Sequence, residues 1–190
     1  KNGKETELPE DFYSSEFFID QMIEFIEEDK EMDSPFFAYL SFQAQHIPLQ
    51  APQEFIDKYL TTYEEGWDIL REQRKNNAVE KGIFPPDKKI VDSMSTLDSW
   101  SALDQESKKM IIKSMAVFAG MLDAMDFHIG RFMTYLKKEG LYENTIFIVT
   151  ADNGPEGNDP SDHAPWREWF KTTIYDLSLI HISEPTRPLS

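Results

Sequence analysis

Two short uncharged hydrophobic runs are the clearest elements that the order of hydrophobic and polar residues predicts. The first covers residues 36–42 and the second covers residues 145–150. Both runs are short for a helix, and the second is rich in β-branched side chains, so each is predicted to be a buried β-strand. The loop after the first run holds Pro48 and Pro52. Because proline has no amide donor, that loop cannot continue a central strand.

Helical periodicity surrounds the first run. Ser14 or Ser15 can cap a helix that runs to about Asp29, and a shorter helix is predicted to start at Pro52. The longer one has acidic residues on one face, which are expected to be solvated. Residues 61–104 are polar and are expected to cross the surface, with a weak helical pattern around residues 66–81. The hydrophobic face of the first helix is predicted to hold Phe18, Met22, Phe25 and Ile26.

A much longer helix is predicted to begin near Asp104 and to end before Gly140. Lys137 and Lys138 fall in its last turn, where cations are favourable, and glycine is a common residue just beyond a helix. Apolar residues recur along it at spacings of three and four, which indicates one buried stripe. The large side chains of that stripe are Ile111, Met115, Phe118, Leu122, Met125, Ile129, Phe132 and Leu136.

A strand, a helix and a second strand in this order are typical of a crossover between parallel strands. The carboxyl ends of parallel strands meet at one edge of a sheet, where open α/β sheets bind their ligands. His46 follows the first predicted strand, and Asp152 and Asn153 follow the second. We therefore expect an α/β fold with a mainly parallel sheet flanked by helices, in which these three residues face one crevice.

Composition excludes several classes of partner. The formal net charge of −16 argues against a nucleic-acid partner, because phosphate binding needs a basic surface. An anionic substrate is also repelled unless a local cation reverses the field. No apolar run approaches the ~20 residues that span a membrane. The chain has no cysteine, which excludes disulfides and thiolate metal sites within it but does not fix the compartment.

Asp152 and Asn153 offer a carboxylate and an amide oxygen, the ligands that Ca²⁺ and Mg²⁺ prefer. The same residues also suit a tight turn, because Asn-Gly is a common turn pair. His46 has a similar ambiguity, since a single histidine in a loop is often solvated or structural. His128, within the long helix, is interpreted as a surface or packing residue, and so is His163.

Three segments in order resemble an arylsulfatase, in the sulfatase branch of the alkaline-phosphatase superfamily. Residues 36–52, FFAYLSFQAQHIPLQAP, are similar to a family strand followed by Ala-Pro-His-x-Pro-Leu-Gln-Ala-Pro. Residues 125–131, MDFHIGR, resemble part of the helix before the last metal motif of the family. Residues 145–157, TIFIVTADNGPEG, resemble that motif, a hydrophobic strand ending in Ser/Thr-x-Asp-Asn-Gly.

The resemblance implies hydrolysis of a sulfate ester at a site built around a formylglycine and one Ca²⁺. Asp152 and Asn153 match the second pair of Ca²⁺ ligands in the family. His46 matches the histidine that contacts the sulfate and helps the leaving oxygen depart. Gln45 stands where the family usually has proline, and Ile47 where an aromatic residue is frequent, so the preferred leaving group is open.

The resemblance covers roughly residues 12–176, which we interpret as an internal fragment of a catalytic domain spanning 1–176 and incomplete at both ends. The formylglycine motif, Cys/Ser-x-Pro-x-Arg, and the first pair of Ca²⁺ ligands belong upstream of His46 in the family. Residues 183–187, SEPTR, match the motif but follow the metal motif, so we reject them. The lysine that the family supplies downstream of the metal motif is expected to be missing, and Lys171 is a possible substitute whose context does not match. Residues 177–190 resemble a translated sequencing adapter and are interpreted as a non-native tail.

This chain is therefore expected to be inactive by itself, as part of a parent that acts on a sulfate ester. One alternative is a phosphodiesterase or phosphonate hydrolase of the same superfamily. The other is a non-catalytic acidic binding module that kept the fold and lost the chemistry. An upstream formylglycine motif would favour the sulfatase, and a bare threonine nucleophile would favour the phosphatase side.

Overall fold

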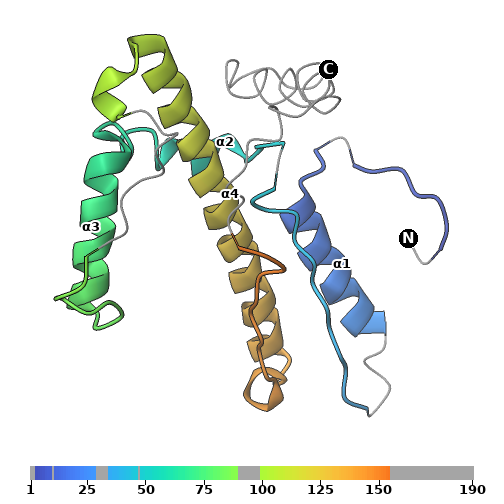
Figure 1. The fold of residues 1–190 in the computed structure, drawn as a ribbon. Coiled ribbons are helices and arrows are strands. Elements are labelled where there is room, and N and C mark those ends of the chain that lie inside the picture. Colours follow the sequence, from blue (N-terminus) through green and yellow to red (C-terminus); the bar gives the residue numbers. More distant parts are fainter. Residues whose placement is uncertain (1–2, 10, 29–33, 47, 90–98, 155–190) are drawn as a thin grey trace.

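One long helix, α4 (Gln105–Lys138), forms the axis of the molecule. The computed structural model describes residues 3–9, 11–28, 34–46, 48–89 and 99–154. Helix α1 (Ser14–Glu28) and the short helix α2 (Gln53–Asp57) pack on α4, whereas α3 (Gly66–Glu80) stands on the other side of α4 from α1 (Figure 1). Two 3-10 turns, η1 (Trp100–Ala102) and η2 (Tyr142–Asn144), flank α4. Within the described ranges, no helix has an apolar stretch long enough to cross a membrane.

Both predicted ends of α4 are confirmed. Asp104 is the N-cap, and its carboxylate accepts hydrogen bonds from the Ser107 amide at 2.8 Å and from the Ser107 hydroxyl at 2.9 Å. At the other end Gly140 has a φ of 71°, and the Leu141 amide donates to the Leu136 carbonyl at 2.8 Å. The left-handed conformation is one that glycine adopts without a Cβ clash, so the chain reverses there and leaves the helix.

The main hydrophobic core lies between α1 and the second half of α4. It is built on Ile19 of α1 with Phe132 and Leu136 of α4, all with at most 6% of their surface exposed. Met22 and Ile26 pack against this cluster as predicted, but Phe25 is 36% exposed. The hydrophobic face of α1 is therefore centred on Ile19 rather than on the phenylalanines.

The buried stripe of α4 differs from the predicted one in the part of the helix that precedes Phe132. Phe132 and Leu136 are buried as expected, whereas Leu122 is 46% exposed. The buried positions nearer the start of the helix include small residues, which allow the backbone of α2 to approach closely. A Cβ added at Gly120 would lie 3.1 Å from the Ile56 amide nitrogen. These small positions are Ala116, Gly120 and Ala124.

The two predicted strands are not formed in the part of the chain that the structure describes, so the predicted sheet is not observed. Residues 36–42 and 145–150 run as open lengths of chain beside the helices (Figure 1). A β-strand needs hydrogen bonds from a neighbouring strand, and neither run has one among the described residues. The exposed fractions are correspondingly high, at 92% for Phe37 and 86% for Ile148.

The first run nevertheless keeps the two-residue alternation of a strand. Leu40 and Phe42 pack against the core between α1 and α4, while Phe37 and Tyr39 are exposed. In Figure 1 this run and residues 145–150 both start at the lower end of the molecule and rise in the same direction. The helices thus cover one face of the first run, and the two runs have the relative direction that a parallel crossover requires.

The weak helical pattern in the polar region is confirmed as α3. Gly66 starts this helix with a φ of 82° and lies directly beneath the indole of Trp100. Trp67 meets the same indole edge-on, with 5.1 Å between ring centroids. Any side chain at position 66 would meet the Trp100 ring, so glycine is required there both for its conformation and for its size.

Candidate functional site

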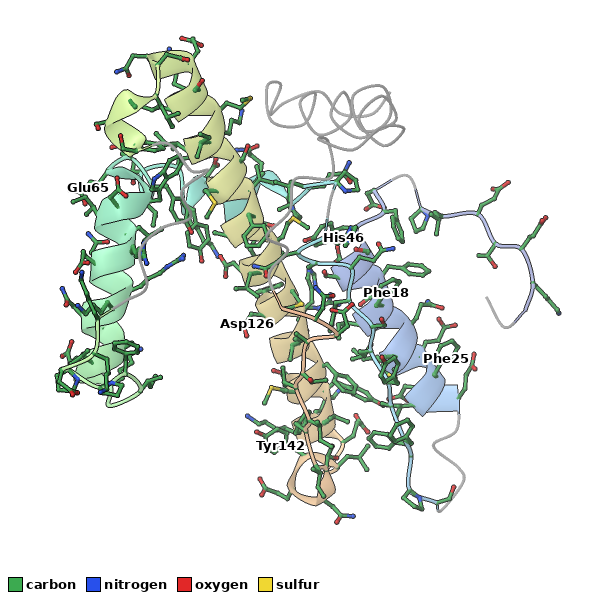
Figure 2. All side chains as sticks on the ribbon, in the orientation of Figure 1. Phe18, Phe25, His46, Glu65, Asp126 and Tyr142 are labelled. Carbon is green, nitrogen blue, oxygen red and sulfur yellow. The ribbon has the colours of Figure 1, made fainter. Side chains whose placement is uncertain are left out.

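His46 lies in the turn that ends the first hydrophobic run. Its side chain is exposed, and its backbone amide donates to the Gln43 carbonyl at 2.8 Å. The peptide bond between Ala44 and Gln45 is cis. In the view of Figure 2, His46 lies near the start of α1. The turn holds the backbone at residue 46 while leaving the imidazole accessible to a small ligand.

Asp152 and Asn153 form a compact polar turn after the second run. The Asn153 amide donates to Oδ1 of Asp152 at 3.0 Å, and Nδ2 of Asn153 donates to the Gly154 carbonyl at 2.7 Å. Both side chains are exposed. Because the side-chain nitrogen Nδ2 of Asn153 donates within the turn, the side-chain oxygen Oδ1 is the atom presented to a ligand. The turn prediction and the ligand prediction are thus compatible.

This turn fits part of a coordination sphere for a hard cation. It supplies a carboxylate and an amide oxygen, whereas Ca²⁺ takes about 6–8 oxygen ligands. Among the described residues no group of three or more His, Cys, Asp or Glu side chains could hold a metal ion. His46 is therefore not brought into a multi-ligand metal cluster with Asp152.

Several residues weighed in the sequence lie outside the described residues. These are Ile47, His163, Lys171, the SEPTR string at 183–187 and the segment 177–190. The roles of His46, Asp152 and Asn153 stay predictions.

A polar network between α1 and α4 was missed by the sequence interpretation. Arg131 of α4 contacts Asp20 at 2.6 Å and Glu16 at 3.6 Å, both on α1, and its Nη1 lies 2.9 Å from Nδ1 of His128. These two carboxylates are exposed as predicted, but the prediction missed that they also bind a cation of the neighbouring helix. The four-residue spacing of Glu16 and Asp20, on one helix face, was the available signal.

His128 is a packing residue, which is one of the two roles predicted for it. The side chain is buried, with 4% of its surface exposed. The imidazole packs against the rings of Phe127, at 5.2 Å, and Tyr13, at 6.3 Å. Burial lowers the pKa of His128, because an apolar surrounding disfavours the imidazolium. The carboxylates of Glu16, Asp20 and Glu54 oppose this shift, and the Arg131 charge acts in the same direction as burial.

Comparison with known proteins agrees with the motif resemblance. A family model described as sulfatase matches residues 1–175. An uncharacterized sulfatase of Schizosaccharomyces pombe is 41% identical over 149 residues, which is 77% of this chain and 26% of that protein. An arylsulfatase of Klebsiella aerogenes is 37% identical over 154 residues, covering 81% of this chain and 33% of the enzyme.

A more distant relative is a multifunctional alkaline phosphatase superfamily protein of Trinickia caryophylli. It is 25% identical over 165 residues, covering 82% of this chain and 30% of that protein. The chain thus spans between about a quarter and a third of the length of these relatives.

Proposed function

Because the chain belongs to the sulfatase family of hydrolases, within the alkaline phosphatase superfamily, we propose that it forms part of an arylsulfatase-like enzyme that cleaves sulfate esters. The observation that carries the proposal is the placement of His46 and of the Asp152–Asn153 turn. Each follows an extended hydrophobic run, and the two runs rise in the same direction beside α1 and α4. The α/β fold of the family places ligands at such a position, beyond the carboxyl ends of parallel strands.

Asp152 and Asn153 are proposed as two oxygen ligands of a Ca²⁺ ion. Their exposed oxygens and the acidic character of the chain both support a cation there, since the formal net charge of −16 repels a sulfate ester at long range. When bound, Ca²⁺ would neutralise charge on the sulfuryl oxygens. Two protein ligands satisfy only part of its coordination, so we propose that the remaining ligands lie outside residues 1–176.

His46 is proposed as the group that contacts the sulfate and donates a proton to the departing oxygen. An alkoxide or phenoxide leaves more readily when a positioned acid protonates it. The exposed ring and the fixed backbone of the turn support this role. The nucleophile, a formylglycine, is proposed to be supplied from outside residues 1–176, so that this chain alone does not turn over substrate.

The same proposal divides the chain into a sulfatase segment, 1–176, and a non-native tail, 177–190. The end of the family match at residue 175 supports this division.

Calorimetric titration of the chain with Ca²⁺ tests the assignment of the metal ligands. We expect weak binding that Asp152→Asn removes, because that substitution deletes the charged ligand. Asp126→Asn is the matched control, since it removes the same charge from an exposed aspartate that belongs to helix α4 rather than to the Asp152–Asn153 turn. Submicromolar affinity would contradict the proposal that most ligands lie elsewhere. Weak binding that survives Asp152→Asn would contradict the assignment of Asp152.

A phosphodiesterase or phosphonate hydrolase is the second candidate, since one relative is a multifunctional member of the same superfamily. The two candidates differ in the group that is transferred. The two candidates are separated by measuring how fast the full-length polypeptide turns over three substrates. These are an aryl sulfate, an aryl phosphodiester and an aryl phosphonate. We expect the sulfate to be preferred, and a preference for either phosphorus ester would select the second candidate. Loss of all three activities would indicate the non-catalytic binding module.

A further inference from the structure

His128 lies where three elements meet. It belongs to α4, its ring is 6.3 Å from Tyr13 just before α1, and it is 6.5 Å from Phe55 of α2. Phe55 is itself buried, with 5% of its surface exposed. Helix α2 begins directly after the loop that carries His46. A movement of the His128 ring would therefore alter its contacts with Tyr13, just before α1, and with Phe55 of α2, the helix that follows the His46 loop.

The hydrogen bond between Arg131 and His128 fixes the state of the imidazole. A guanidinium only donates, so Nδ1 of His128 accepts at 2.9 Å and must carry no proton. The ring is thus neutral, with its proton on Nε2. If Nδ1 gained a proton, two donors and two positive charges would face each other at this distance. The bond would be lost, and one of the two side chains would have to move.

Carboxylates surround the His128–Arg131 pair and could bind an imidazolium as well as the guanidinium. Glu16 and Asp20 of α1 already bind Arg131, and Glu54 of α2 also acts on His128 through its charge. An imidazolium would compete with Arg131 for the same acidic groups. If the His128 ring moved, its contact with the Phe55 ring would be lost, and α2 would be held less firmly on α4.

We propose that the His128–Arg131 pair is a pH-sensitive joint, which holds the start of α1 and helix α2 on α4 while the imidazole is neutral and releases them when it is protonated. The direction of the pH dependence follows from the burial of His128. The pKa of His128 is lowered in the folded chain, so the unfolded chain binds this proton more readily. The stabilising contribution is present above the ordinary histidine pKa and is lost as the pH falls through the lowered one.

Hydrogen exchange of the chain at about pH 7.5 and about pH 5 tests the joint across the range in which histidine titrates. After correction for intrinsic exchange rates, we expect residues 13–20 and 53–57 to lose protection in acid. The loss should be up to about tenfold for each unit by which the pKa is lowered. In His128→Gln the amide oxygen can still accept from Arg131 but does not titrate, so this loss should disappear. In His46→Gln, which removes an exposed histidine, the loss should persist.

Equal protection of residues 13–20 and 53–57 at both pH values would overturn the proposal, and so would a loss in His128→Gln as large as in the wild type. If that variant does not fold, the NMR titration of the His128 ring in the wild-type chain decides. A ring that titrates at or above the ordinary histidine pKa would overturn the proposal, whereas a lowered pKa that coincides with loss of protection supports it.

Discussion

Replacing Gly120 by alanine tests how closely α2 sits on α4. An added Cβ would lie 3.1 Å from the Ile56 nitrogen and 3.2 Å from its Cα, closer than ordinary van der Waals contact. These are backbone atoms, which cannot move aside as the end of a flexible side chain can. Alanine in a helix gains about 0.8–1.0 kcal/mol over glycine, whereas overpacking a well-packed site costs about 1–3 kcal/mol. The net expectation is a destabilisation of about 0–2 kcal/mol.

The same helix supplies a matched control. Gly130 is exposed, and a Cβ at that position meets nothing within 4 Å. Gly130→Ala should therefore show only the gain in helix propensity and stabilise the chain by up to about 1 kcal/mol. The two substitutions are chemically identical, so effects of opposite sign on the free energy of unfolding isolate the contact with α2.

Urea unfolding followed by far-UV circular dichroism provides the measurement. Gly120→Ala should lower the midpoint and Gly130→Ala should raise it, with the denaturant slope unchanged in both. If Gly120→Ala raises the midpoint as much as Gly130→Ala does, then α2 does not rest on Gly120 and the described packing is refuted.

Three further substitutions test the core and the N-cap of α4. Leu136→Ala should destabilise the chain by about 2–5 kcal/mol, because the side chain has no exposed surface, whereas Leu122→Ala, at a position 46% exposed, should have a much smaller effect in the same unfolding assay. Equal effects would contradict the placement of the buried stripe. Asp104→Ala should lower the unfolding midpoint near neutral pH, because the carboxylate caps the helix and its hydrogen bonds with Ser107 lower the pKa of Asp104. That difference should vanish as the pH falls through this lowered pKa, and a difference that persists in strong acid would argue against capping by the carboxylate.

The helices could be predicted because their signals are local. Asp104 and Gly140 mark the ends of α4, and Pro52 marks the start of α2. The buried stripe was predicted only in part, because large apolar residues were taken as its markers. The face toward α2 is formed by Val117 together with the small residues Ala116 and Gly120, and close approach of two backbones leaves no signal in hydrophobicity. Leu122 shows the consequence, since a large side chain there faces solvent.

The two predicted strands depend on a signal that is not local. Residues 36–42 keep the alternation of a strand, with Leu40 and Phe42 against the core, yet they make no ladder among the described residues. A sequence pattern indicates a preference for strand, but hydrogen bonding requires a neighbour that the pattern does not name. The network of Arg131 with Glu16 and Asp20 was missed for a similar reason, because it joins residues that are far apart in the sequence.

For the candidate site, the sequence indicated the chemical types of its residues and their position after two runs of equal direction. The structure describes the local turns of His46 and Asp152–Asn153, and their joint site stays a prediction. The roles proposed for these residues depend on groups proposed to lie outside residues 1–176, so they are tested in the full-length polypeptide.

The most direct measurement of the central claim is the turnover of an aryl sulfate by the full-length polypeptide with and without His46→Ala. If His46 donates a proton to the leaving oxygen, kcat should fall by about 10²–10⁴. The fall should be smaller for a sulfate ester whose leaving group is more acidic, because such a group needs less protonation. An unchanged kcat would contradict the account and remove His46 from the mechanism.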